Sequence, residues 1–294
     1  MRAKVVLVGL ILSMSAAVAA AQTQTRPTTP SPGQLYCSGV VTTESVPRDT
    51  LLITGEQSVY KTTFEEGDYV YINKGSSQGV RVGDEFLIIR PVVDSIKSEW
   101  TKWQTAILHK MGTVWDDEGR VKVIVSQSDV SIGQVEHACQ YLERGDIALP
   151  FSVRTAPQLK LENNFDRFVQ ANGKALAMVI AAKNFQQQTG KNDIVYVNLG
   201  TDQGVKVGDY FRIFRYQGTE HETAYQTPRF AFDVEGDWGP TYGYGKAPSK
   251  YNWSNVPRDN LGEGIVLRTG PNSSTVLITF ALREVYSGDY VELE

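Results

Sequence analysis

The sequence predicts a mainly β protein built from two tandem, homologous modules, with a long irregular insert in the second. Two observations support this fold class. A stretch of 23 residues occurs twice along the chain, and within each copy apolar residues alternate with polar ones, which is the period of a half-buried strand. The 26 glycines and 14 tyrosines among 294 residues also favour strands and tight turns.

The repeat joins residues 68–90, DYVYINKGSSQGVRVGDEFLIIR, to residues 193–215, DIVYVNLGTDQGVKVGDYFRIFR. The offset is 125 residues without a gap, and 14 of the 23 positions are identical. Identity at this level over an ungapped stretch indicates duplication of an ancestral module.

Each copy begins with an alternating strand, at Val70 and Ile72 in the first copy and at Val195 and Val197 in the second. Glycine-rich turns follow, extended structure resumes at the paired valines after them, and a further strand follows each Gly-Asp pair. We therefore expect a tightly turned β meander with one buried face. The residues assigned to structural turns are Gly75, Gly79, Gly83, Asp84, Gly200, Gly204, Gly208 and Asp209.

A looser second block closes each copy, at residues 121–149 and 264–293. Both blocks contain two apolar runs, a Ser-rich connection and a final Gly-Asp pair before the last strand. Five or six short strands of this kind predict a small barrel or sandwich, SH3-like or similar, because closure limits exposed strand edges.

These blocks place module 1 at 36–151, a linker at 152–175 and module 2 at 176–294. The insert of the second module runs over 216–258. The first module carries a shorter insert, from Pro91 to Lys110, that has room for a short helix.

The N-terminus predicts a cleaved signal peptide at 1–21. Arg2 and Lys4 precede an apolar run, and Ala19-Ala20-Ala21 fits the small-residue rule for cleavage before Gln22. A transmembrane anchor is the alternative, but the strongly apolar core is shorter than the roughly 20 residues that a span needs. Residues 22–35 are polar and Pro-rich, which predicts a disordered linker, and export points to the periplasm of a Gram-negative envelope.

Two cysteines, Cys37 and Cys139, predict a disulfide in an oxidising compartment, with two buried free thiols as the alternative. Removing Arg2 and Lys4 with the signal changes the formal charge from −4 to −6. An acidic chain of this kind argues against general nucleic-acid binding, which needs a basic face.

The run N-x-G-x-x-x-G-V-x-V-G-D-x-F occupies Asn73 to Phe86 and again Asn198 to Phe211. Together with the closing Gly-Asp strands, it resembles the C-terminal β domain of flagellar assembly protein T and the β modules that accompany LysM domains in Gram-negative envelope proteins. The two-copy arrangement also looks like exported acidobacterial-type proteins of unassigned function. The resemblance implies a small β barrel, periplasmic residence and a role in assembly or scaffolding.

Catalytic and cofactor motifs are missing from the sequence. His109, His137 and His221 are scattered, and the cysteines lie about 100 residues apart, which argues against a zinc site. No nucleophile elbow, P-loop or dinucleotide fingerprint occurs. We expect no catalytic residue, no metal and no cofactor. The aspartates of the Gly-Asp pairs are interpreted as acceptors of turn N–H groups, with paired glycosidase carboxylates as the alternative.

The insert of the second module supplies the candidate binding residues, because Trp and Tyr stack on sugars and anchor protein contacts. They are Trp238, Tyr242, Tyr244, Tyr251 and Trp253. Packing of these rings on the barrel is the alternative.

Three functions remain in order of preference. The first is a non-catalytic exported scaffold or assembly protein that binds other envelope proteins. The second is a module that binds peptidoglycan or another polysaccharide, and the third is a glycan-active enzyme.

Overall fold

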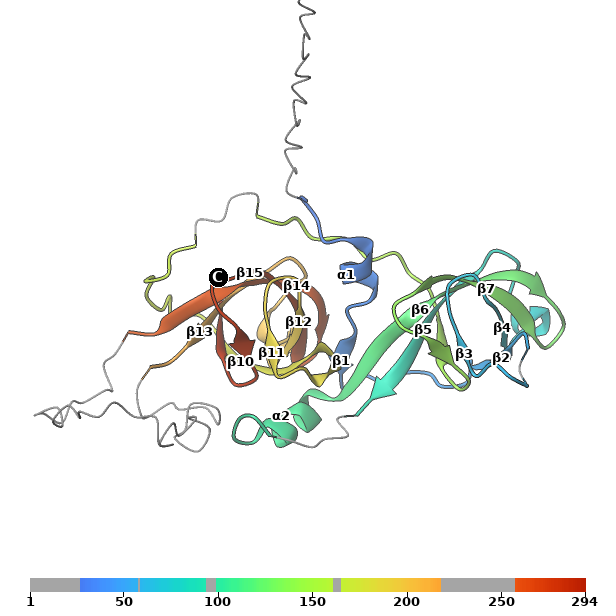
Figure 1. The fold of residues 1–294 in the computed structure, drawn as a ribbon, viewed down its shortest axis with the longest axis horizontal. Coiled ribbons are helices and arrows are strands. Elements are labelled where there is room, and N and C mark those ends of the chain that lie inside the picture. Colours follow the sequence, from blue (N-terminus) through green and yellow to red (C-terminus); the bar gives the residue numbers. More distant parts are fainter. Residues whose placement is uncertain (1–26, 58, 94–98, 161–164, 218–256) are drawn as a thin grey trace, which may run out of the picture.

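The computed structural model describes residues 27–57, 59–93, 99–160, 165–217 and 257–294. These residues form two β units that lie side by side along the long axis of the molecule (Figure 1). The predicted mainly β class is confirmed, and one of the units is a closed barrel. The predicted signal peptide lies outside the described residues.

The first unit is an antiparallel sheet in the order β2-β4-β7-β6-β5-β9, with β1 added along β6. A two-stranded sheet of β3 and β8 accompanies it. The strands are β1 (Val40–Thr42), β2 (Leu52–Gly55), β3 (Thr63–Phe64), β4 (Tyr69–Ile72), β5 (Glu85–Val92), β6 (Thr113–Ser126), β7 (Ser131–Ala138), β8 (Leu142–Glu143) and β9 (Ile147–Pro150).

The second unit is a closed barrel in the order β10-β12-β15-β14-β13-β17, with β10 pairing back to β17. A two-stranded sheet of β11 and β16 accompanies it. The strands are β10 (Leu176–Ala182), β11 (Gln188–Thr189), β12 (Ile194–Val197), β13 (Tyr210–Arg215), β14 (Asp259–Gly270), β15 (Ser273–Ala281), β16 (Val285–Tyr286) and β17 (Tyr290–Leu293).

The two units follow the same strand order. In both units the first and last strands of the sheet approach each other, but only the second unit is a closed barrel. In the barrel, Val179 N donates to Asp289 O at 2.8 Å and Gly288 N donates to Val179 O at 2.7 Å. In the first unit, Leu52 N donates to Asp146 O at 2.9 Å and Gly145 N donates to Leu52 O at 2.8 Å. The ends of the first sheet therefore meet at a few bonds without forming a continuous ladder.

The predicted meander is wrong, because the two strands of each 23-residue repeat do not pair with each other. β4 pairs with β2 and β7, whereas β5 pairs with β6 and β9. The intervening chain crosses the β6–β7 hairpin, where Ser76 N donates to Gln127 O at 2.7 Å. In the barrel the corresponding turn crosses the β14–β15 hairpin, where Asp202 N donates to Pro271 O at 3.0 Å. Contact with a distant hairpin overrides the local preference for a simple turn.

The glycines of these crossings serve two different purposes. Gly79 and Gly204 have φ of 89° and 85°, and Gly83 and Gly208 both have φ of 95°, in the left-handed region that favours glycine. Gly75 has an extended backbone, but a Cβ there would overlap the carbonyl oxygen of Gln127. Gly200 is equally crowded, against the carbonyl oxygen of Gly270. The valines after these turns lie in no strand.

Each unit encloses its own apolar core. Val70, Ile72 and Ile88 are buried in the first unit, and Val195, Val197, Phe211 and Ile213 are buried in the second. Burying each such side chain stabilises the fold by about 1.5–3 kcal/mol. Tyr196, which the alternation places on the outer face of its strand, is also buried, because that face of the barrel packs against the first unit.

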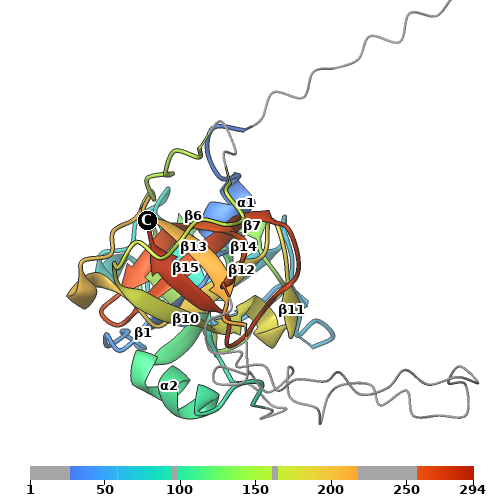
Figure 2. The ribbon, with the colours of Figure 1, turned by 90° about the vertical axis from the view of Figure 1, so that its left-hand side faces the viewer.

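Two short helices lie near the place where the units meet. α1 (Pro32–Tyr36) starts at Ser31, whose hydroxyl caps the helix. The predicted disordered linker 22–35 is therefore wrong over its last four residues, because Leu35 is buried. α2 (Gln104–Met111) falls in the predicted first insert and lies beneath β10 in two views (Figures 1 and 2). There the Gln104 side chain donates to Ile180 O at 2.6 Å.

The predicted linker 152–175 packs along the second unit. Lys160 contacts Glu263 and Glu294, and Asn172 N donates to Glu292 Oε1 at 2.8 Å. Within the described part of the chain, no helix combines the length and apolar character needed to cross a bilayer.

Candidate functional site

A pocket of about 240 Å³ opens on the first unit, beside the place where α1 meets the sheet. Tyr36 from α1 and Phe151, just after β9, form its aromatic walls, with ring centroids 5.4 Å apart and planes tilted by 42°. Pro32 and Leu87 complete the apolar lining. A concave apolar surface with a few polar groups is the usual form of a binding site.

Charged side chains from β6 and β7 line the other part of the pocket. Arg120 lies with its guanidinium carbon 5.1 Å from the centroid of the Phe151 ring. The same guanidinium lies 3.3 Å from Glu136 and 3.4 Å from Glu85. A pocket with this lining can bind an apolar side chain and hydrogen-bond to the polar groups next to it.

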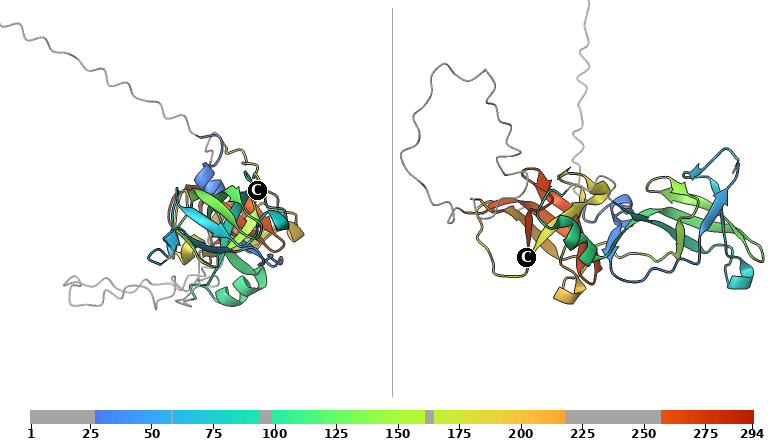
Figure 3. Two further views of the ribbon diagram at one scale, coloured as in Figure 1. Left: turned by 90° about the vertical axis from the view of Figure 1, so that its right-hand side faces the viewer. Right: turned by 90° about the horizontal axis from the view of Figure 1, so that it is seen from below.

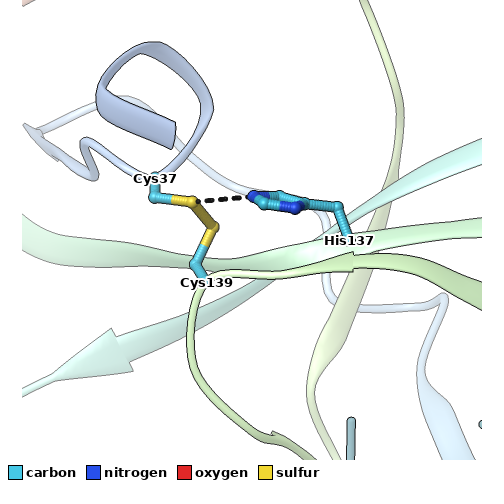
Figure 4. A group of neighbouring side chains, drawn as sticks. All are labelled: Cys37, His137 and Cys139. Carbon is cyan, nitrogen blue, oxygen red and sulfur yellow. Dashed lines mark hydrogen bonds between the residues drawn. A yellow bond between two sulfur atoms is a disulfide. The ribbon is translucent and has the colours of Figure 1, made fainter. Parts of the chain in front are cut away.

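The disulfide between Cys37 and Cys139 lies at the edge of this pocket and confirms the predicted pairing. It ties the end of α1 to the chain that leaves β7. His137 points at it, with Nε2 3.4 Å from Cys37 Sγ (Figure 4). The nitrogen and sulfur atoms of Cys37, Cys139 and His137 all lie within 4.8 Å of one another. The structure thus gathers three potential metal ligands that the long sequence distances argued against.

The chain that follows Cys37 lies between the two units (Figure 3, right). Its backbone carbonyls accept hydrogen bonds from four barrel side chains. The donors are Lys183 to Cys37, Tyr196 to Ser38 at 3.3 Å, Thr275 to Gly39 at 3.1 Å, and Ser273 to Val41. On its other side β1 pairs with β6, so this segment joins the two units.

Asp117 on β6 is the most connected side chain of this junction. Its side chain is 1% exposed and accepts two hydrogen bonds from Arg154, at 2.9 and 3.0 Å. Arg268 of the barrel donates at 3.2 Å, and Gly39 N donates at 2.9 Å. Burial opposes ionisation of this carboxyl, but Arg268, Arg154 and the Gly39 N–H outweigh it and lower its pKa. A charge with so many fixed partners stabilises the junction and is poorly suited to proton transfer.

Asp116 and Glu118, the neighbours of Asp117 on β6, have pKa values shifted in the opposite direction. Burial raises the pKa of Asp116, and burial also raises the pKa of Glu118 to about 7, although Arg90 favours the ionised form. One carboxylate oxygen of each side chain is buried without a hydrogen bond to the described residues. Glu118 Oε1 lies 3.6 Å from the Arg90 guanidinium. Of these two acids, Glu118 therefore changes its charge near neutrality.

The aspartates of the Gly-Asp pairs all accept turn N–H groups. Asp84 Oδ2 accepts from Arg81 N and Asp209 Oδ2 from Lys206 N, both at 2.8 Å. Asp146 and Asp289 accept from Glu143 N and Tyr286 N, at 2.7 and 2.8 Å. These contacts favour the structural interpretation over paired catalytic carboxylates.

Asp146 and Asp289 each make a further contact, to an arginine, that was not predicted from the sequence. Arg90 binds both oxygens of Asp146 at 2.7 and 2.8 Å, and Arg215 binds both oxygens of Asp289 at the same distances. The signal was present, since Arg90 and Arg215 are the last identical residues of the repeat. We call these two pairs the Arg–Asp clamps.

The predicted aromatic binding residues of the insert lie outside the described residues. They are Trp238, Tyr242, Tyr244, Tyr251 and Trp253. The pocket residues were not singled out in the sequence, because Tyr36, Arg120 and Phe151 come from three separate regions. The one local signal for the disulfide group was His137 two residues before Cys139, since such residues share a face of a strand.

No protein-family model matches this chain, and a search of curated proteins finds no match.

Proposed function

We propose that this protein is a non-catalytic, exported scaffold or assembly protein of the bacterial envelope that binds other envelope proteins through the pocket beside the disulfide. The observation that carries the proposal is the combination of aromatic walls with the Arg120–Glu136 pair at one concave surface. Aromatic residues and arginine are enriched among the residues that dominate protein–protein binding energy.

The roles of the polar residues support a non-catalytic protein. The repeated aspartates bind turn N–H groups, two of them also bind arginine, and Asp117 joins the two units. Side chains with fixed partners keep a scaffold rigid, and rigidity reduces the entropy lost on binding a partner.

Duplication of one small β module explains the shared strand order and the two Arg–Asp clamps. We propose that the units are homologous modules, SH3-like or similar. The first remains open where the second closes. The resemblance of residues 73–86 and 198–211 to the C-terminal β domain of flagellar assembly protein T fits a role in assembly.

Export is part of the proposal because of the signal-like N-terminus and the disulfide. Disulfides persist in oxidising compartments such as the periplasm and are rare in the cytosol. The periplasm also holds the envelope proteins that the scaffold would bind.

Pull-down from envelope extracts after mild crosslinking tests the proposal, with wild-type protein beside Phe151→Ala and Arg120→Ala. We expect a distinct set of envelope proteins with the wild type and recovery reduced about ten-fold or more by either substitution, the effect expected for a binding hot spot.

Phe168→Ala provides the matched control, because Phe168 is 80% exposed and lies outside the pocket. It should leave recovery unchanged. Recovery of the same proteins by all four chains would contradict binding through the pocket, and recovery of no envelope protein by the wild type would contradict the scaffold role.

Polysaccharide binding is the second candidate, favoured by the tilted Tyr36–Phe151 pair, since aromatic rings also stack on sugars. Co-sedimentation with purified sacculi distinguishes the two. Sedimentation of the wild type but not of Phe151→Ala would favour the polysaccharide, whereas the scaffold role predicts no sedimentation of either.

A further inference from the structure

The strongest feature outside the proposed binding role is the group formed by Cys37, Cys139 and His137. The Cα atoms of the two cysteines are 5.4 Å apart, and the His137 side chain lies against the sulfur atoms (Figure 4). All three residues are half-buried, so the group is fixed by the fold yet open to small solutes. In a tetrahedral zinc site, sulfur lies about 2.3 Å and nitrogen about 2.0–2.1 Å from the metal.

The surroundings of His137 add an independent observation. Its Nδ1 lies 3.8 Å from Glu66 Oε2, while its Nε2 faces the sulfur atoms. This distance is longer than a hydrogen bond, but the Glu66 side chain is exposed and can rotate toward Nδ1. A carboxylate hydrogen-bonded to the far nitrogen is a usual second shell of a metal-bound imidazole, because it fixes the ring and raises its basicity. The pocket borders both His137 and Cys139, so it leaves room for a fourth ligand.

We propose that the reduced form of this protein binds one thiophilic metal ion, Zn²⁺ or Cu⁺, through Cys37 Sγ, Cys139 Sγ and His137 Nε2. Thiolates and imidazole are the ligands that these ions prefer. The disulfide and the metal exclude each other, because each uses both sulfur atoms. The group is therefore a redox-gated metal site, and it requires no protein partner.

The conversion needs a dithiol reductant. One of its thiolates attacks a cysteine sulfur, the Cys37–Cys139 bond breaks, and a mixed disulfide forms. The second donor thiolate resolves it, so the donor becomes a disulfide and the two electrons remain on Cys37 and Cys139. Binding of Zn²⁺ then releases the two thiol protons.

Native mass spectrometry and Co²⁺ absorption test the site on the full exported protein, oxidised and reduced under anaerobic conditions. We expect one Zn²⁺ per reduced chain, with loss of two protons, and none per oxidised chain. Co²⁺ should give a thiolate charge-transfer band in the reduced protein only. Circular dichroism of each sample reports whether the fold is retained.

His137→Gln removes one of the three ligands and should weaken Zn²⁺ binding of the reduced protein by ~10-fold or more, and by more than Glu66→Gln does. His109→Gln, on α2, is the matched control and should bind as the wild type does.

Two results would overturn the site: a folded, reduced protein that binds no Zn²⁺, or a His137→Gln variant that binds Zn²⁺ as tightly as the wild type. If reduction unfolds the chain, recovery of the fold on adding Zn²⁺ supports the proposal, and failure to recover overturns it. Neither outcome depends on the pull-down, so the metal site and the scaffold role are tested independently of each other.

Discussion

The two β units use the same strand order but stabilise it differently. The second closes into a barrel through continuous pairing of β10 with β17. In the first unit, only a few hydrogen bonds around Leu52 join the two ends of the sheet. This unit has instead the added strand β1 and the Cys37–Cys139 disulfide. Closure removes exposed strand edges, so the barrel needs no covalent support, whereas the open sheet is reinforced by a crosslink.

The difference also separates the tasks of the two units. The pocket, the disulfide and the buried acids of β6 all lie on the first unit. The second contributes Lys183, Tyr196 and Arg268 to the junction. We interpret the barrel as the support against which the open unit is held, and the open unit as the binding part.

Replacement of both cysteines should have the largest effect and sharpen this comparison. Cys37→Ser with Cys139→Ser opens a crosslink with a sequence separation of 102 residues. The expected loss is about 4–5 kcal/mol in the free energy of unfolding, from the added entropy of the unfolded chain. Hydrogen exchange should rise most in α1, β1 and the first sheet. Equal rises in the barrel would contradict the division between a crosslinked and a closed unit.

The Arg–Asp clamps test whether the two units depend on the same contact. Asp146→Ala and Asp289→Ala each leave a mostly buried arginine without its bidentate partner. Each should lower the free energy of unfolding by about 3–5 kcal/mol. Urea denaturation measures both. A large loss in one variant and none in the other would show that the clamps are not equivalent.

Glu118 of the first unit should make the stability of the protein depend on pH near neutrality. Its carboxyl binds its proton more tightly in the folded protein, where its pKa is about 7, than in the unfolded chain, where it is near 4.5. The folded state therefore holds more protons between these values, and its stability falls as pH rises through this window. Glu118→Gln should remove part of this fall in urea titrations at several pH values. An unchanged slope would contradict the burial argument.

Asp117, on the same strand, should change stability with pH in the opposite direction to Glu118. Its lowered pKa contributes stability at every pH above about 3.8, and this is lost only as the pH falls through its folded value. The two contributions thus occupy different pH ranges, and the Glu118→Gln comparison isolates the one near neutrality.

The turn aspartates should have the smallest effect. Asp84→Ala and Asp209→Ala each remove one hydrogen bond between the aspartate side chain and a backbone N–H. Both bonds are exposed to solvent. A loss of about 1 kcal/mol is expected for each in thermal or urea unfolding. A loss as large as that of the clamp variants would show that these aspartates do more than stabilise a turn.

The sequence repeat was sufficient to predict the strands at 69–72 and 194–197. The two cysteines, taken with the predicted export, were sufficient to predict the disulfide. The repeat did not predict that the strands on either side of each turn belong to different parts of the sheet. That pairing depends on the β6–β7 and β14–β15 hairpins, which lie about 50 and 70 residues later in the chain.

The contacts of the junction and of the pocket could not be predicted from the sequence for the same reason, since they join residues far apart along the chain. Asp117 meets Arg154 and Arg268 only after both units fold, and Tyr36 meets Phe151 only after the two ends of the first unit come together. Local alternation placed Tyr196 on the outer face correctly, but it could not indicate that another unit covers that face. The insert, on which the predicted binding residues fall, lies outside the described residues.

Photo-crosslinking in the native envelope tests most directly whether the pocket binds a protein. A photoreactive residue at Pro32 lies at the pocket and leaves the Arg120–Glu136 pair intact, and one at Val82, which is 66% exposed on a turn of the same unit, serves as the control. We predict that irradiation joins a second protein to position 32 and not to position 82. Adducts of equal yield at both positions, or none at position 32, would contradict binding at this pocket.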